Sequence, residues 1–292
     1  MNEEKNKVLP HTLYLVATPI GNLSDLSPRG VKVLSECDFI AAEDTRNTRK
    51  LLTYFGISRE TVSYHEHNRF EAGEAICRRL EAGESCALVT DAGMPAISDP
   101  GEDLVDLCAR RGITVSVIPG CCAAVSALAL SGLPTGRFVF EGFLSSLGKD
   151  RQKRLKELKD EKRTLIFYEA PHRLVKTLTD MKAVFGPSRR IALVRELTKR
   201  NEEALRTTLG EALLYYQTAE PRGEYVLVVE GGAETEPADH ADYTDLSPTQ
   251  HVAAHEAAGL SHKDAIKAAA TDRGLSKSEF YALLVKEKEQ DK

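Results

Sequence analysis

The 292 residues include 39 Lys and Arg against 44 Asp and Glu, which gives a formal net charge of −5. That balance argues against a protein that coats nucleic acid non-specifically, although a specific RNA partner needs only a local basic patch. The hydrophobic share of 42% and charged share of 28% are those of a soluble globular protein, long enough for two domains. No apolar run reaches the roughly 18 to 20 residues that cross a bilayer, and the N-terminus lacks the apolar segment of a secretion signal. We therefore expect a cytoplasmic protein without a membrane partner.

Six cysteines are spread along the chain, with no CxxC pair and no histidine partners at zinc spacing. Two of them are adjacent, which excludes an ordinary unstrained disulfide between that pair. We expect reduced, mostly buried thiols and no metal site. The cysteines are Cys37, Cys77, Cys86, Cys108, Cys121 and Cys122.

The first half alternates short β-rich runs with helical segments, which predicts βαβ units around a mainly parallel sheet. Pro28 after Ser27 is a typical first helical position following a cap. Strands are predicted at 13–18, 39–42, 86–90 and 113–118, and helices at 28–35, 46–54, 71–82 and 101–111. An apolar helix follows Pro119 and Gly120.

The alternation starts again after 132–136, which predicts a second α/β domain. We therefore expect an N-terminal α/β domain at 11–134 and a C-terminal one at 135–232, with the strand order left open. Strands are predicted at 138–141, 164–168, 191–195 and 225–230, and helices at 149–160, 171–184 and 210–217.

Residues 233–246 are acidic and poor in large apolar side chains, as is typical of a linker. In the tail at 247–292, capping-box patterns begin at Ser247, Ser261 and Ser276, and each predicts the start of a short helix. The last two helices have helix-turn-helix spacing, which suits a nucleic-acid reader and a small docking bundle equally.

One stretch, 149–163, is strongly basic and is a candidate RNA-facing surface. Within it, Lys153, Arg154 and Lys156 are the candidate RNA contacts, and Arg173 is a further one. The alternative is the solvated outer face of an amphipathic helix, which is what charge runs usually form.

Three loops contain the Gly, Pro and Asp residues expected where a parallel sheet binds a ligand, beyond the carboxyl ends of its strands. They are TPIGN at 18–22, TDAGMPAISDPG at 90–101 and PGCCAA at 119–124. None is a P-loop or a GxGxxG motif. Together they offer backbone groups at close approach, small side chains and the carboxylate of Asp91, a mixture that suits adenine, a ribose diol and an amino-acid tail. Each loop alone could be an ordinary turn.

Nine motifs, in order over roughly residues 11 to 232, closely resemble one family, the small-subunit rRNA (cytidine-2′-O)-methyltransferases within the tetrapyrrole methylase superfamily. The tail resembles the family's terminal helical module more loosely. The motifs are VATPIGNLSDLSPR, EDTR, YHEHN, VTDAGMPAISDPG, IPGCCAAVSALALSGL, FEGFL, TLIFYEAPHR, RELTK and GEYVLVVEG.

The resemblance implies two α/β domains of the tetrapyrrole methylase type, with S-adenosylmethionine in a cleft between them and a small C-terminal helical module. It also implies a homodimer that methylates a cytidine 2′-hydroxyl (cytidine 1402 in the family) of 16S rRNA or the small ribosomal subunit, without a metal. The loop DAGMPAI departs from the superfamily's Gly-Asp-Pro pattern. The implied cofactor contacts are Asp91, Ala92, Gly93, Ile97, Cys122, Ala123, Ala124, Tyr168, Glu169, Leu197 and Gly223.

Catalysis requires that the ribose hydroxyl be held in line with the methyl group and lose its proton. Polar groups at the predicted sheet ends are the candidates, although residue type alone does not choose the base. Some of these cations could instead bind phosphate. The candidate catalytic residues are Glu43, Asp44, Arg46 and Lys199, with His65 and Glu196 as further ones.

Two other functions remain open. A tetrapyrrole (precorrin-type) C-methyltransferase would share the fold and cofactor, but those enzymes carry a GxGPGD first loop where this chain has TPIGNLSD. A non-enzymatic regulator that uses the terminal helices would leave the three glycine-containing loops unexplained.

Overall fold

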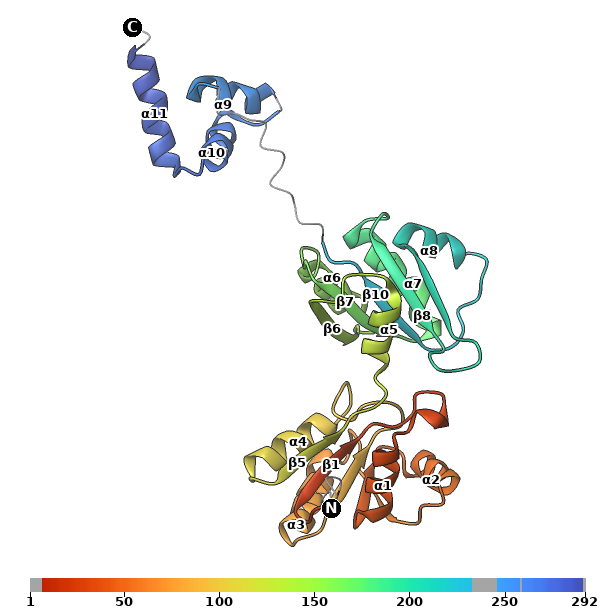
Figure 1. Cartoon of the computed structure of the whole chain (residues 1–292). Helices are drawn as coiled ribbons and strands as arrows, with labels where there is room; N and C mark the ends of the chain where they lie inside the picture. The colour runs from red at the N-terminus through yellow and green to blue at the C-terminus, as the bar shows by residue number, and fades with distance from the viewer. Residues whose placement is uncertain (1–6, 233–245, 258, 291–292) are drawn as a thin grey trace, which may run out of the picture. The chain divides into compact units, whose positions relative to one another are not determined.

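The computed structural model describes residues 7–232, 246–257 and 259–290 of the chain (Figure 1). The chain divides into two compact units, one ending at Gly232 and the other starting at Ala233. The first unit contains two five-stranded sheets, and the second contains three helices within the described residues. These elements confirm the predicted class, two α/β sheets followed by a helical tail.

The first sheet is parallel throughout, as the alternation of strands and helices predicts. Its order is β3-β2-β4-β1-β5, which places β4 at the centre. The strands are β1 (Thr12–Val16), β2 (Phe39–Ala42), β3 (Glu60–Ser63), β4 (Cys86–Val89) and β5 (Thr114–Ile118). The prediction missed β3, because this edge strand has the half-exposed sequence ETVS and no apolar run.

Helices cover both faces of this sheet (Figure 1). Alternate residues of β2 show the division, since Phe39 and Ala41 pack in one core cluster while Ile40 and Ala42 pack in the other. The first cluster includes side chains of α3 and α4, and the second includes side chains of α1 and α2. The helices are α1 (Pro28–Glu36), α2 (Thr45–Tyr54), α3 (Arg69–Glu81) and α4 (Gly101–Arg110), with a 3₁₀ turn, η1, at Leu23–Asp25.

The second sheet is mixed, with the order β6-β7-β10-β8-β9. Only β6 and β7 run parallel, whereas β10 is antiparallel to both of its neighbours and β8 is antiparallel to β9. The strands are β6 (Phe138–Phe143), β7 (Thr164–Glu169), β8 (Arg190–Arg195), β9 (Glu203–Thr208) and β10 (Tyr225–Val229). The prediction also missed β9, an edge strand whose sequence EALRTT is mostly polar.

The helix α5 packs on one face of the second sheet, and the other three helices of this half pack on the opposite face. The small Ala124 and Ala127 are buried against Val194 and Val228 of the sheet, so α5 can approach it closely. The helices are α5 (Ala123–Ser131), α6 (Gly148–Glu157), α7 (Pro171–Phe185) and α8 (Leu209–Tyr215).

The second unit contains α9 (Pro248–Ala257), α10 (His262–Asp272) and α11 (Lys277–Gln290) around a small apolar core that includes Phe280. All three predicted caps form. Ser247 and Ser276 exchange reciprocal side-chain-to-backbone bonds with Gln250 and Glu279, and the hydroxyl of Ser261 accepts from the N–H of Asp264. The predicted linker lies outside the described residues except for its last position.

The split of the first unit into two domains at residue 134 stays a prediction, because the contacts keep both sheets in one compact unit. Among the helices that the structure describes, none is both long enough and apolar enough to cross a membrane.

Candidate active site

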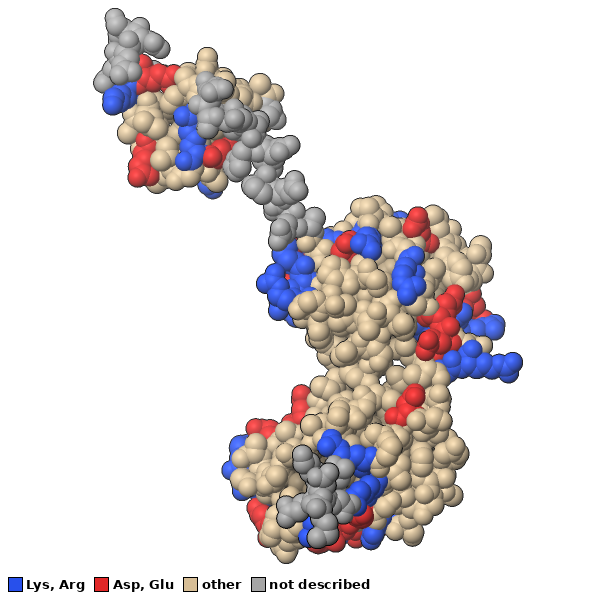
Figure 2. All heavy atoms as spheres, in the orientation of Figure 1, with Lys and Arg blue, Asp and Glu red and all other residues tan. Residues whose placement is uncertain are grey.

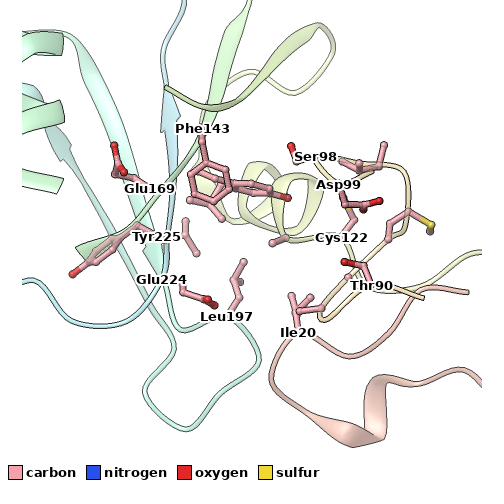
Figure 3. A pocket seen from close by; sticks show the side chains of 18 of the residues that line it. Ile20, Thr90, Ser98, Asp99, Cys122, Phe143, Glu169, Leu197, Glu224 and Tyr225 are labelled. Atoms are coloured by element: carbon pink, nitrogen blue, oxygen red, sulfur yellow. The ribbon is translucent and has the colours of Figure 1, made fainter. Parts of the chain in front are cut away.

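A pocket of about 320 Å³ lies between the two sheets of the first unit, lined by loops from both (Figure 3). From the first half come the loops after β1, β2, β4 and β5. From the second half come the ends of β6, β7 and β8 and the start of β10. Because β10 is antiparallel to both β7 and β8, its first residue lies at the carboxyl ends of these strands. There Tyr225 pairs with Glu169 of β7 and with Arg195 of β8. Figure 3 shows Glu169, Leu197 and Tyr225 on one side of this space and Thr90, Asp99 and Cys122 on the other.

The loops after β1 and β4 are joined to each other. The backbone groups of Thr18 and Gly93 exchange hydrogen bonds of 2.9 and 3.1 Å, and Oγ1 of Thr18 donates to the carbonyl of Thr90. Gly21, in the first loop, approaches the second half so closely that a Cβ there would lie 2.5 Å from Cγ of Lys199. A larger residue would have to displace the Lys199 side chain, so glycine allows the first loop to approach the loop after β8.

Backbone strain is concentrated around the pocket. Among the described residues, the non-glycine positions with positive φ other than His11 are Ala96 and Ser98 in one loop and Glu196 and Thr198 in the loop opposite. Such conformations cost on the order of 1–3 kcal/mol each and persist where the surroundings impose them. Such strain is common at functional sites, which points to these two loops.

The pocket is rich in carboxylates. Oδ1 of Asp99 accepts from the backbone N–H groups of Ala96 and Gly101, which orders its loop. Burial raises the pKa of Asp99, and the charge of Glu43 raises it further. The acidic lining residues are Glu43, Asp99, Glu169, Glu196 and Glu224, and Lys199 is the lysine among them. A lining with this charge favours a cationic ligand.

Glu43 follows β2, and its Oε2 accepts a hydrogen bond of 2.6 Å from Oγ1 of Thr90. Its neighbour Asp44 is the cap of α2 and holds Arg46 by two bonds, of 2.7 and 3.1 Å, between the side chains. That contact keeps the pKa of Asp44 well below its usual range. Asp44 and Arg46 therefore satisfy each other outside the pocket, and only Glu43 of this motif lines it.

Lys199 lies opposite, with Nζ 3.0 Å from Oε1 of Glu196. Burial alone would lower the pKa of Lys199, but the bond to Glu196 and the charge of Glu224 raise it above its usual value. Lys199 is therefore protonated at neutral pH and is not a proton acceptor there.

Tyr168 forms part of an aromatic wall, with its ring centroid 5.1 Å from that of Phe140 and 5.5 Å from that of Phe143. Its hydroxyl oxygen accepts a bond from the backbone N–H of Ala124. Burial raises the pKa of Tyr168 to about 12, so the phenol is neutral.

Most of the cofactor contacts implied by the motifs come together in this pocket, whereas Asp91, Ala124 and Gly223 lie outside its lining. Asp91 lines a second, smaller hollow. Gly223 has a structural reason for being glycine, since its φ is +78° and a Cβ would meet Oε1 of Glu196 at 2.4 Å. The implied contacts that do line the pocket are Ala92, Gly93, Ile97, Cys122, Ala123, Tyr168, Glu169 and Leu197.

The sequence interpretation did not select several residues that line the pocket. All of them except Val194 stand in the quoted motifs, so the resemblance offered a signal for each, as for Phe143 in FEGFL and Glu224 in GEYVLVVEG. The place of β10 beside β7 depends on an antiparallel pairing that the sequence does not reveal. The residues not selected are Ile20, Thr90, Met94, Ser98, Asp99, Phe143, Ala170, Val194, Glu224, Tyr225 and Val226. His65, a further catalytic candidate, does not line this pocket.

The basic segment lies partly in α6, and Figure 2 shows Lys and Arg side chains gathered near this helix. Arg154 donates to Glu141 at 2.8 Å and to Glu157 at 3.0 Å, while Lys153 and Lys156 are exposed. Arg173 donates to the carbonyl of Leu144 and lies 3.3 Å from the buried carboxylate of Glu169, so it takes part in local packing.

A cluster of three possible metal ligands occurs in the helical unit, where one carboxylate oxygen of Asp272 lies 3.2 Å from His251 and 2.7 Å from His255. Nε of Arg273 donates to Nδ1 of His251, so Nε2 of this ring carries its proton. A metal at Nε2 would require the opposite tautomer, and the cluster is a hydrogen-bonded network.

Comparison with known proteins places this fold among methyl-transferring enzymes. Residues 12–213 match the model of the family Tetrapyrrole (Corrin/Porphyrin) Methylases. The chain is 52% identical over 270 residues to ribosomal RNA small subunit methyltransferase I of Halalkalibacterium halodurans, covering 92% of this chain and 93% of that one. It is 44% identical to the protein of the same name from Bacillus subtilis, with 92% of each chain covered. These similarities confirm the resemblance read from the motifs.

Among solved structures, the chain is similar to uroporphyrin-III C-methyltransferase from Thermus thermophilus, with a TM-score of 0.54 and 20% identity over 75% of this chain and 94% of that one. It is also similar to diphthine synthase, with a TM-score of 0.56 and 15% identity over 75% and 90%. At these identities the likeness concerns the fold.

Proposed function

The chain belongs to the tetrapyrrole (corrin/porphyrin) methylases, and we propose that it transfers a methyl group from S-adenosylmethionine to small-subunit ribosomal RNA. We propose further that the acceptor is the 2′-hydroxyl of a cytidine. The relatives that share about half of its residues are named for methylation of the same RNA class. A related fold from Thermus thermophilus, 21% identical, was crystallised with S-adenosyl homocysteine.

The observation that best supports S-adenosylmethionine as the methyl donor is the acidic pocket between the two sheets. S-adenosylmethionine is a net cation, with a sulfonium and an ammonium charge against one carboxylate. The lining holds five carboxylates and one lysine, although Glu169 is already paired with Arg173 outside the lining. The volume of about 320 Å³ lies at the lower end of the range for small-molecule sites. When bound, the donor supplies an activated methyl group, and its positive charge is lost as the methyl leaves.

The residues of this chain would hold the donor from both sides. On the first side, Gly93 and Ala123 leave the backbone open to close approach. On the second side, Tyr168 and Phe143 offer flat apolar rings against which a purine can pack. Leu197 adds apolar surface and, with these rings, helps to exclude water.

Glu43 is the best-placed proton acceptor of the residues considered from the sequence. It lines the pocket, it is fixed by the bond from Thr90, and its other carboxylate oxygen, Oε1, remains to accept a proton. Lys199 is protonated, and Asp44 is engaged with Arg46. Lys199 would instead contribute positive charge at the rim of the pocket.

RNA contact through Lys153 and Lys156 fits their exposure on α6. Contact through Arg154 or Arg173 would require these side chains to leave the carboxylates that hold them. The homodimer and the cytoplasmic location stay predictions.

In the deciding experiment, the purified chain is incubated with methyl-tritiated S-adenosylmethionine and with small ribosomal subunits. The subunits come from a strain that lacks this protein. We expect one labelled nucleotide, a cytidine whose 3′ linkage resists alkaline cleavage, because a methylated 2′-oxygen cannot attack the adjacent phosphate. Label on a base atom, or label only on an added uroporphyrinogen, would contradict the proposed acceptor. The second outcome would favour the tetrapyrrole C-methyltransferase.

A further inference from the structure

A second hollow, of about 220 Å³, opens beside the pocket just described and shares one lining residue with it, Thr90. It lies between the loop after β1, which contributes Pro19 and Leu23, and the first turns of α2. The 2.6 Å bond from Thr90 to Glu43 therefore lies where the two spaces adjoin. A ligand in this hollow would be next to the group proposed to accept the proton.

The polar groups of this hollow form a donor–acceptor pair. Nδ2 of Asn47 donates to Oδ2 of Asp91 at 3.3 Å. A carboxylate offers about four lone-pair sites, and an amide nitrogen carries two N–H groups. After this bond, Asp91 still has acceptor capacity and Asn47 still has one N–H, so an acceptor and a donor lie side by side.

This order matches one class of nucleobase edge. Cytosine presents an amino donor at N4 beside an acceptor at N3, and carboxylates accept from this amino group in protein–DNA complexes. Uracil presents the reverse order, so its O4 would face the Asp91 carboxylate and its N3–H would face an N–H of Asn47. Adenine shares the order of cytosine but is a larger base.

The two spaces differ in charge: cations lie near the second hollow, where phosphate could bind, and carboxylates line the larger pocket, where S-adenosylmethionine is proposed to bind. Lys50 lines the second hollow and Arg49 is exposed on the same helix, whereas Arg46 is already paired with Asp44. RNA-binding proteins use such cations to hold the sugar–phosphate backbone. The larger pocket is acidic and repels phosphate, so the RNA backbone would follow α2 and only the sugar edge would reach Glu43.

We propose that this second hollow receives the base of the acceptor nucleotide, and that Asp91 and Asn47 select cytosine over uracil through its exocyclic amino group. The inference deepens the proposed function and rests on it. It gives Asp91 a role in choosing the acceptor, in place of the cofactor contact implied by the motifs.

The first test measures binding without activity. The full chain, saturated with S-adenosylhomocysteine, is titrated with cytidine 5′-monophosphate and with uridine 5′-monophosphate, followed by NMR of the nucleotide. We expect the cytidine nucleotide to bind roughly tenfold more tightly, and Asp91→Asn to remove the preference, because an amide can turn its N–H toward O4 of uracil. Equal binding of both nucleotides to the unaltered chain would overturn the inference.

The second test uses small subunits that carry cytidine or uridine at the methylated position. Asp91→Asn should lower the cytidine-to-uridine ratio of kcat/KM by roughly tenfold, while the Kd for S-adenosylmethionine changes less than about threefold. Asp106→Asn, an exposed change on α4, is the matched control and should leave the ratio unaltered. An unchanged ratio in an active Asp91→Asn enzyme refutes the base selection alone, whereas an unaltered chain that methylates neither subunit refutes the proposed function.

Discussion

The hydroxyl oxygen of Tyr168 lies 3.2 Å from the backbone nitrogen of Ala124, so a side chain of the second sheet accepts from an amide in the first turn of α5. The cap residue of α5, Cys122, makes no side-chain capping bond, and the tyrosine takes that place. The chain reaches Cys122 directly from β5 of the first sheet. This one bond therefore fixes the loop that lines the pocket to the strand that faces it.

Tyr168→Phe should lower the free energy of unfolding by about 1–3 kcal/mol, because the N–H of Ala124 would be left without its acceptor. The ring would remain, so the affinity for S-adenosylmethionine should fall by less than about tenfold. Tyr168→Ala, which removes the ring, should reduce the affinity more. Urea unfolding and calorimetry measure the two quantities. A Phe variant as stable as the unaltered chain would show that Ala124 finds another acceptor.

Glu43→Gln should lower kcat by on the order of 10² to 10⁴, the usual contribution of a positioned general base. Gln can still accept the bond from Thr90, so the affinity for S-adenosylmethionine should change little. Glu36→Gln, which alters an exposed carboxylate paired with Lys32 on α1, is the control. If single-turnover methyl transfer by Glu43→Gln kept the normal rate at every pH, Glu43 would not be the proton acceptor.

The sequence predicts the first sheet well because its strands are apolar runs separated by helices with clear caps, such as Ser27 with Pro28. It fails at two of the four edge strands, β3 and β9, because their sequences, ETVS and EALRTT, contain no apolar run. The antiparallel place of β10 is also invisible, because the buried run YVLVV would look the same in either direction. The position of Tyr225 in the pocket depends on this pairing, so its motif alone does not show that its side chain faces the ligand.

The candidate site was predicted best where a loop needs small residues, as at Gly93 and Ala123, since the motif shows them directly. The basic segment was predicted less well, because residue type does not show whether a charge is already paired. Arg151 is the clearest example: it is buried in α6 and donates to Asp180 at 2.7 Å, so it supports the fold.

Lys153→Glu combined with Lys156→Glu should weaken binding to small-subunit RNA and reduce the slope of log K against log salt by up to about two, roughly one for each phosphate that a lysine no longer neutralises. Both side chains are exposed on α6, so the fold should be unaffected. The matched control reverses two exposed lysines of α7, Lys176 and Lys182. If both double variants weaken binding equally, the effect comes from the change in net charge, and the exposed face of α6 does not contact RNA.

Alkylation of the native protein at pH 8 should modify Cys121 and Cys122 first, because these two thiols are partly exposed, although burial also raises the pKa of Cys121. Burial raises the pKa of Cys37 to about 11 and that of Cys108 to about 12, so these thiols stay protonated and shielded at that pH. S-adenosylmethionine should slow modification of Cys122, which lines the pocket, and should leave Cys37 unaffected. Peptide mass spectrometry after timed quenching gives the order. Ligand protection absent at Cys122 would contradict the donor site.

Acid should loosen the helices α9–α11 before it affects the sheets. His251 is fully buried, and burial lowers its pKa below the ordinary value of 6.5, an effect reinforced by the charge of Arg273 and opposed by the bond to Asp272. The unfolded chain then takes up this proton at a higher pH than the folded one. The stabilisation is complete above about pH 6.5 and is lost as the pH falls from there through the folded pKa.

Hydrogen exchange followed by mass spectrometry, corrected for intrinsic rates, should therefore show protection in α10 falling between pH 7 and pH 5 while protection in β10 holds. His262→Gln, at an exposed histidine paired with Glu256, should leave this pH dependence in place, because that side chain lies outside the core of the helical unit. Equal loss of protection in α10 and β10 would place the acid-sensitive groups elsewhere in the chain. Constant protection in both would mean that the buried ring keeps nearly its ordinary pKa, with Asp272 compensating for burial.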